Sequence, residues 1–151
     1  MERREDIQKL IDHELWANRQ IVELALSARD LPDRVQEIMS HVLNAQKVWL
    51  ARLKGESQPV GVWDSVLTEN WLEQVEENSK ELKSVLENTE SLESKITYKN
   101  SKGSSFESTV AEIFHHLMLH SQYHRGQLVV LMKPYATSLP ATDFIFWSRE
   151  G

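Results

Sequence analysis

Four long stretches of the chain carry apolar residues at every third or fourth position, which is the spacing of a helix with one buried face. This periodicity predicts helices at about residues 5–29, 32–53, 68–87 and 110–131. Pro32 suits the first turn of the second helix, and Thr109 with Glu112 forms a capping box ahead of the fourth. Pro134 then ends the fourth helix. The sequence therefore predicts an all-α fold, a four-helix bundle.

The connections between the predicted helices differ in length. Residues 54–67 hold two glycines and a proline, and this connection is longer than a usual helix-helix turn. It can cross the end of the bundle and leave the second and third helices parallel, in an up-down-down-up order. The alternating residues 95–99, followed by turn residues 100–103, predict a small β-hairpin before the fourth helix. The tail, residues 135–151, is expected to be irregular and to pack along the bundle.

The apolar face of the fourth predicted helix is interrupted by two histidines. That face runs through Val110, Ile113, Leu117, His120, His124, Leu128 and Leu131. Imidazoles buried among leucines are costly unless their nitrogens have partners, so the pattern calls for a compensating group such as a metal ion. Because His120 and His124 are four residues apart, their Cβ atoms should lie about 6 Å apart, which lets both rings reach one ion.

A third histidine, His41, lies at or beside the apolar face of the second predicted helix, about midway along it. An ion between the second and fourth helices would then have His41, His120 and His124 as nitrogen ligands. Three protein ligands and an open position are typical of a catalytic metal site. The alternative is that each ring is a core residue bonded to a carbonyl, the commoner role of a lone histidine on an apolar face.

Other polar residues near this candidate site have open roles. Asn18, on the inner face of the first helix, is either a bonded core amide or a group that orients a ligand. His116 is a fourth ligand, a supporting group or a boundary residue, and Tyr123 or a water could move protons. His115 is expected to point elsewhere, and His13, opposite the inner face of the first helix, is expected to be exposed.

The sequence also narrows the possible chemistry. The chain has no cysteine, which excludes disulfides, thiolate ligands and a cysteine nucleophile. Ser121 follows His120, so the His-Glu-x-x-His motif of zinc proteases is missing, and there is no Gly-x-Ser-x-Gly elbow. Gly126 inside the fourth helix disfavours helix formation, and close packing against another helix is the expected reason.

Composition adds limits on partners and location. At 40% hydrophobic and 26% charged residues, the 151-residue chain has the profile of one soluble globular domain, residues 1–151. A net charge of −6 and the absence of a basic face argue against nucleic-acid binding. No apolar run is long enough to span a membrane, and the charged N-terminus is unlike a secretory signal. A cytoplasmic location is expected.

Several of these residues together resemble the DinB/YfiT-like superfamily of bacterial four-helix proteins. The run His-Ser-Gln-Tyr-His-Arg-Gly-Gln at residues 120–127 is similar to its signature, and so are residues 16–18, His41 ahead of Trp49, and residues 141–145. The resemblance implies a bundle with a long crossover between the second and third helices, often a homodimer. It also implies a divalent metal, zinc or nickel, whose three histidine ligands map onto His41, His120 and His124.

The resemblance also implies an activity. Members with known activity are metal-dependent enzymes that use low-molecular-weight thiols, including S-transferases that act on electrophilic small molecules. An open metal position could bind a thiol and stabilise its nucleophilic thiolate form. Two alternatives stay open: a non-enzymatic metal-binding or stress protein, and a metal-free bundle whose histidines are satisfied internally.

Overall fold

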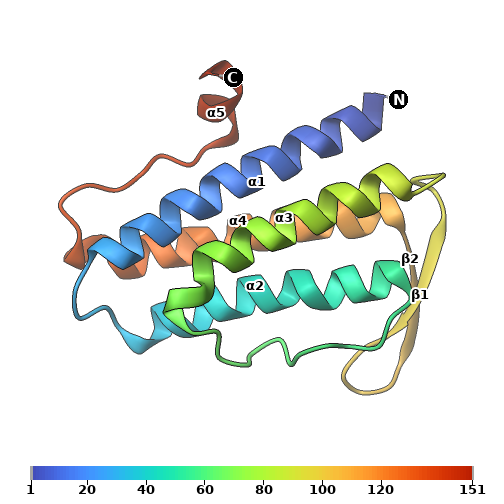
Figure 1. Ribbon diagram of the computed structural model, residues 1–151, viewed down its shortest axis with the longest axis horizontal. Helices are drawn as coiled ribbons and strands as arrows, with labels where there is room; N and C mark the ends of the chain where they lie inside the picture. Colours follow the sequence, from blue (N-terminus) through green and yellow to red (C-terminus); the bar gives the residue numbers. More distant parts are fainter. Residues whose placement is uncertain (1, 151) are drawn as a thin grey trace.

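Long helices dominate the computed structural model, which describes residues 2–150 (Figure 1). The four long helices of this described part are α1 (Glu2–Ser27), α2 (Asp33–Lys54), α3 (Trp71–Asn88) and α4 (Val110–Met132). Helices α1 and α2 each pack against both α3 and α4. In Figure 1, α2 and α3 run in one direction and α1 and α4 in the other. The predicted helical class is confirmed.

The ends of the helices follow local chemistry. Helix α2 stops at Gly55, whose left-handed backbone (φ 70°) lets its N–H bond the carbonyl of Arg52. The predicted capping box of α4 is present, because Thr109 accepts from the backbone of Glu112 and the Glu112 carboxylate accepts from Thr109. Helix α1 ends two residues earlier than predicted, and the chain turns at Asp30, with φ 57°. A short 3-10 helix, Thr68–Asn70, precedes α3.

The crossover between α2 and α3, residues 55–67, returns along the side of α2 (Figure 1). Side chains of α2 hold its backbone: the Gln36 amide donates to the carbonyl of Val66, and the Asn44 amide donates to the carbonyl of Asp64 at 2.7 Å. This segment is long because it must travel back along the helix it leaves before α3 begins.

The predicted hairpin is present and leads directly into α4. Strands β1 (Lys95–Lys99) and β2 (Ser105–Thr109) pair antiparallel, with Tyr98 opposite Phe106. The side chain of Asn100 accepts two backbone N–H bonds within the turn. The first two amides of α4 donate back to the segment before β1, to the carbonyls of Ser94 and Leu92. The start of α4 is therefore fixed to the hairpin.

Apolar side chains within residues 2–150 form two clusters, one toward each end of the bundle. The cluster at the hairpin end contains Ile7, Ile11, Leu50, Leu82, Leu86, Val110, Ile113, Phe114, Leu117 and Met118. The cluster at the other end contains Ile21, Val22, Ala25, Val35, Ile38, Met39, Val42, Leu43, Trp71, Val75, Leu128 and Met132. Met132, rather than the predicted Leu131, closes the buried face of α4.

A layer of buried polar side chains lies between the two clusters. Arg125 of α4 forms an ion pair with Glu14 of α1 and donates to the Asn18 carbonyl oxygen at 2.9 Å. Gln46 of α2 donates to the other Glu14 oxygen at 2.8 Å, and Asn78 of α3 donates to Gln46 at 3.1 Å. All five side chains are buried, and together they join the four long helices.

The tail differs from its prediction. It contains a short helix, α5 (Phe144–Glu150), rather than irregular chain only. His13, expected to be exposed, is only 6% exposed, and its Nε2 lies 2.6 Å from the carbonyl oxygen of Thr142. The rings of Phe144 and Trp147 meet the imidazole edge-on. The prediction that His13 is exposed was wrong because the tail covers that side of α1.

Gly126 also departs from its expected role. It is exposed, and a Cβ atom added there would meet nothing within 4 Å. Within residues 2–150, the expected close packing of Gly126 against another helix is therefore absent. No described helix combines the length and the apolar content that crossing a membrane requires.

The buried His13 should make stability depend on pH. Burial lowers its pKa, partly opposed by the bond to the Thr142 carbonyl. In the unfolded chain the ring titrates near its usual value of about 6.5, so below that pH the unfolded state binds the proton first. The His13 contribution to stability is therefore present above this value and is lost as the pH falls toward the lowered pKa.

The check compares urea unfolding of the wild type and His13→Gln at about pH 7.5 and about pH 5. Glutamine keeps a donor for Thr142 but does not titrate, so this variant should lose less stability on acidification. His115→Gln, at an exposed histidine, is the matched control. Equal losses in the wild type and His13→Gln would contradict the assignment.

The ion pair in the polar layer gives a second prediction. Arg125→Met leaves the Glu14 carboxylate buried without its cation, which should cost about 3–5 kcal/mol of unfolding free energy. Adding Glu14→Gln removes the stranded charge, so the double variant should regain most of that loss. Chemical denaturation of the three proteins measures the difference. A double variant no more stable than the single one would refute this account.

Candidate metal centre

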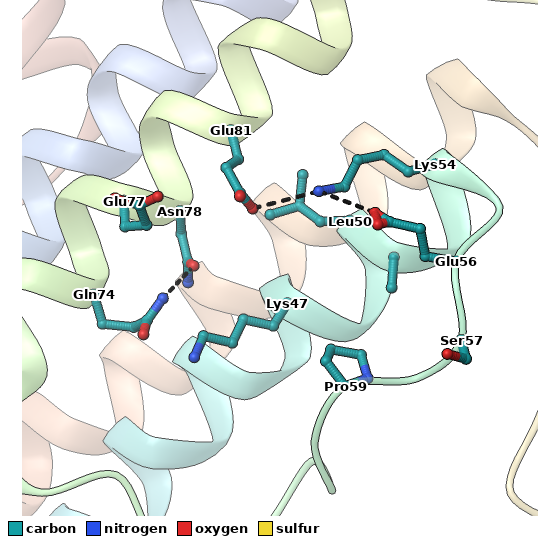
Figure 2. A pocket seen from close by; sticks show the side chains of 11 residues that line it. Lys47, Leu50, Lys54, Glu56, Ser57, Pro59, Gln74, Glu77, Asn78 and Glu81 are labelled. Atoms are coloured by element: carbon teal, nitrogen blue, oxygen red, sulfur yellow. Dashed lines mark hydrogen bonds and ion pairs between the residues drawn. The ribbon is translucent and has the colours of Figure 1, made fainter.

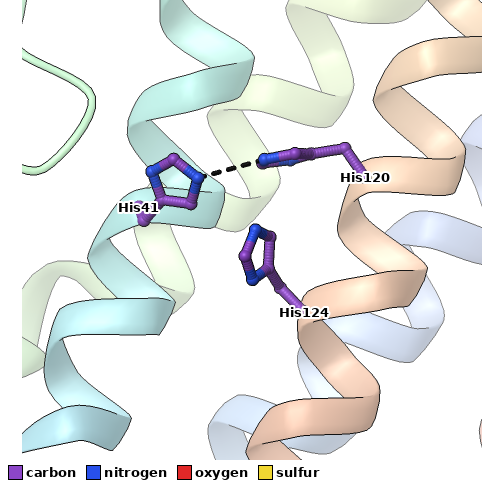
Figure 3. Close-up of side chains that lie close together, drawn as sticks. All are labelled: His41, His120 and His124. Atoms are coloured by element: carbon purple, nitrogen blue, oxygen red, sulfur yellow. Dashed lines mark hydrogen bonds between the residues drawn. The ribbon is translucent and has the colours of Figure 1, made fainter.

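Three histidines meet between α2 and α4. His41 lies midway along α2, and His120 and His124 lie on successive turns of α4, so their rings point toward one another across the gap (Figure 3). One ligand atom from each ring lies within 4.8 Å of the others, and the Nε2 atoms of His41 and His120 are 3.0 Å apart. Tetrahedral zinc–nitrogen bonds of about 2.0–2.1 Å place ligand nitrogens about 3.3 Å apart. The spacing suits one shared ion.

Two of the three rings are oriented by hydrogen bonds on their far side. His41 Nδ1 lies 2.9 Å from the carbonyl oxygen of Val62 in the crossover. His124 Nδ1 lies 2.7 Å from the side-chain oxygen of Gln127, one turn further along α4. Each partner is an acceptor, so Nδ1 carries the proton and the Nε2 lone pair is free to face the centre.

The surroundings of His41 and His120 disfavour protonation of these two rings. Burial, followed by the neighbouring imidazoles of His124, His41 and His116, lowers the pKa of His120 to about 4. Burial also lowers the pKa of His41, opposed in part by the Val62 carbonyl. A metal ligand must be an unprotonated imidazole. Rings that resist protonation at neutral pH therefore fit that role.

Aromatic side chains flank the histidines. Trp63 of the crossover stacks flat on His41, with ring centroids 3.9 Å apart and planes 10° from parallel, and Arg34 lies over the indole. On the other side, Tyr123 is 65% exposed and its ring centroid is 5.1 Å from that of His124. The sequence did not single out Trp63, although an aromatic residue in a long connection was a visible signal.

The remaining candidates lie outside the triad. His116 is exposed, with its ring 5.6 Å from that of His120, the position of a boundary residue. Asn18 accepts a hydrogen bond from Arg125 in the polar layer. Of its two expected roles, it therefore has that of a bonded core amide. His115 points elsewhere, since its Nδ1 bonds the carbonyl of Ala111 one turn back in α4.

A second concave site lies on the far side of α2 (Figure 2). This pocket of about 360 Å³ lies between α2, α3 and the start of the crossover. Some of its polar side chains contact one another: Lys54 lies 3.3 Å from Glu56 and 3.8 Å from Glu81, and Gln74 donates to Asn78. Its lining contains no converging group of metal-ligating side chains, so the triad is the stronger candidate site.

The donor set decides what the triad can hold. Among the described residues, His41, His120 and His124 are the one group of three or more metal-ligating side chains that converge. Neutral imidazole suits zinc and nickel equally, so ligand type does not separate these ions. The protein is thus a helical bundle with a three-histidine group that could hold a divalent metal.

Sequence comparison places the chain among known proteins. The model of the DinB family matches residues 1–149, so the chain belongs to the DinB family. Protein DinB of Bacillus subtilis (strain 168) is 23% identical over 157 residues, which cover 90% of each protein. The resemblance read from the residues around His120 and His124 is confirmed.

The bond between His124 and Gln127 can be tested through metal affinity. Gln127→Ala removes the acceptor that fixes the ring, and loss of such a supporting bond typically weakens binding by about 10–100-fold. Gln127→Glu keeps an acceptor and should stay close to the wild type. Competition for Zn²⁺ with a chromophoric chelator gives the affinities. Unchanged affinity in Gln127→Ala would show that this bond does not orient the ligand.

Proposed function

We propose that this DinB-family protein holds a divalent metal ion, zinc or nickel, on His41, His120 and His124. We propose further that it is a transferase that joins a low-molecular-weight thiol to an electrophilic small molecule. The observation that supports this most is the convergence of three imidazoles, two of them oriented through Nδ1. The known activity of related proteins supports the choice of thiols.

The chemistry needs few protein groups. The ion supplies positive charge that favours the thiolate form of a bound thiol. The sulfur lone pair then forms a bond to the electrophilic carbon, and the leaving group departs with the electron pair of its own bond. The thiol proton passes to solvent beside Tyr123, which is exposed at the rim. Trp63, stacked on His41, shields one side of the centre and holds that ring in place.

A non-enzymatic metal-binding or stress role is the second candidate. It is favoured by the position of His41, which contacts the crossover through Val62 and α4 through His120. An ion there would cross-link α2 and α4, and His41 in turn bonds the crossover, so the ion would stabilise the fold without turnover. For either role we propose a homodimer in the cytoplasm, and the exposed apolar side chains Leu119 and Val130 on α4 support self-association.

Metal content and turnover separate these candidates. Untagged protein should contain stoichiometric zinc or nickel by elemental analysis, and His120→Ala should lose both the metal and the conjugation of small thiols to chlorodinitrobenzene. His115→Ala, on the same helix and exposed, should keep both. Metal-dependent melting without turnover would support the second candidate. Protein that binds neither ion when supplied would contradict both.

A further inference from the structure

A partly buried arginine lies at the hairpin end of α2, on the side of the histidines. Arg52 is in the last turn of α2, and its guanidinium carbon lies 4.4 Å from the ring centroid of Trp49 and 4.8 Å from that of Tyr98. It also donates to the carbonyl of Lys99 at 3.1 Å. These contacts hold the guanidinium in one orientation with further N–H donors available.

The charge of Arg52 has no counter-ion in the protein. Among the described residues, no carboxylate oxygen lies within 4.0 Å of its nitrogens, whereas Lys54 in the same turn contacts Glu56 and Glu81. A cation is favoured at a helix C-terminus, which explains a basic residue here but not its burial between two rings. Burial lowers the pKa of Arg52, so the surroundings remove water without supplying a negative charge. An anion from outside would supply it.

A continuous strip of rings connects this cation to the triad. The ring centroid of His116 lies 5.6 Å from that of His120 and 5.2 Å from that of Trp49. Arg52 then follows directly, stacked on Trp49. Eleven positions separate Arg52 from His41 on α2, which corresponds to about 16 Å along the helix axis. The Arg52 side chain reaches back over Trp49 and shortens that span.

A cavity lies next to Arg52 on the protein surface. This cavity of about 400 Å³ is lined by residues that include Arg52, Lys99, Gln58 and Asn100. Glu56 also lines it, but its carboxylate contacts Lys54. A guanidinium at the edge of such a cavity is a donor that suits a carboxylate, and the lining residue Lys99 adds a second positive charge nearby.

We infer that Arg52 recognises the anionic end of the substrate. The ligand is an elongated thiol whose sulfur lies at the triad, whose middle lies over His116 and Trp49, and whose carboxylate binds Arg52. This inference rests on the proposed metal-dependent thiol function. It makes Arg52 a determinant of substrate specificity rather than a catalytic residue.

The test uses two matched series of thiols on cobalt-loaded protein. Mercaptopropionate, mercaptohexanoate and mercaptooctanoate are compared with the mercaptoalcohols of equal length, and binding is followed by the thiolate-to-cobalt absorption band. The wild type should prefer the acid over the alcohol by about tenfold at a chain length that spans the strip, and little at the shortest length. Arg52→Gln should abolish the preference, and Arg52→Lys should retain part of it.

The ratio of the two affinities separates recognition from a structural role. Arg52 also tethers the hairpin, so a merely structural loss would weaken acid and alcohol binding equally and leave their ratio unchanged. Lys47→Gln, on the same helix but outside this cavity, should not change the ratio. Equal binding of acids and alcohols by the wild type would overturn this inference alone. If neither series binds the cobalt-loaded protein, the proposed thiol function fails and the inference fails with it.

Discussion

The buried ion pair between Glu14 and Arg125 is the contact on which the rest of the bundle depends. Leucine and isoleucine faces can slide past one another by a helical turn at modest cost, but a buried carboxylate and guanidinium cannot. With Gln46 and Asn78 the pair links all four long helices. A slip of any one helix would leave at least one buried polar group without a partner. The polar layer therefore favours a single register.

That register also sets the geometry of the histidines. Arg125 directly follows His124 on α4, and Gln46 lies little more than one turn after His41 on α2. Because Gln46 and Arg125 both bond Glu14, α2 and α4 are fixed relative to each other at the level where their imidazoles meet. The crossover contributes the second constraint, since the Val62 carbonyl orients His41 and the indole of Trp63 covers it. The buried polar contacts that fix the packing of the helices therefore also fix the geometry of the histidine site.

The parts of the structure that could be predicted are those with a local signature. The four long helices, the capping box at Thr109 and the hairpin follow from periodicity and turn chemistry, and the convergence of the histidines follows from their positions on two apolar faces. His13 was misjudged because its cover, α5, lies at the other end of the chain. The role of Val62 could not be predicted, since any residue supplies a backbone carbonyl. The prediction that Gly126 packs closely against another helix was wrong, because the sequence of one helix does not show whether another helix faces a given position.

The direct junction between β2 and α4 has a mechanical consequence. No loop separates the strand from the helix, and the first amides of α4 bond the segment before β1. The helix that carries His116, His120 and His124 therefore cannot fray from its N-terminal end without peeling away the hairpin as well. Helix α4 and the hairpin therefore move together, so a displacement of the hairpin also displaces the imidazoles on α4.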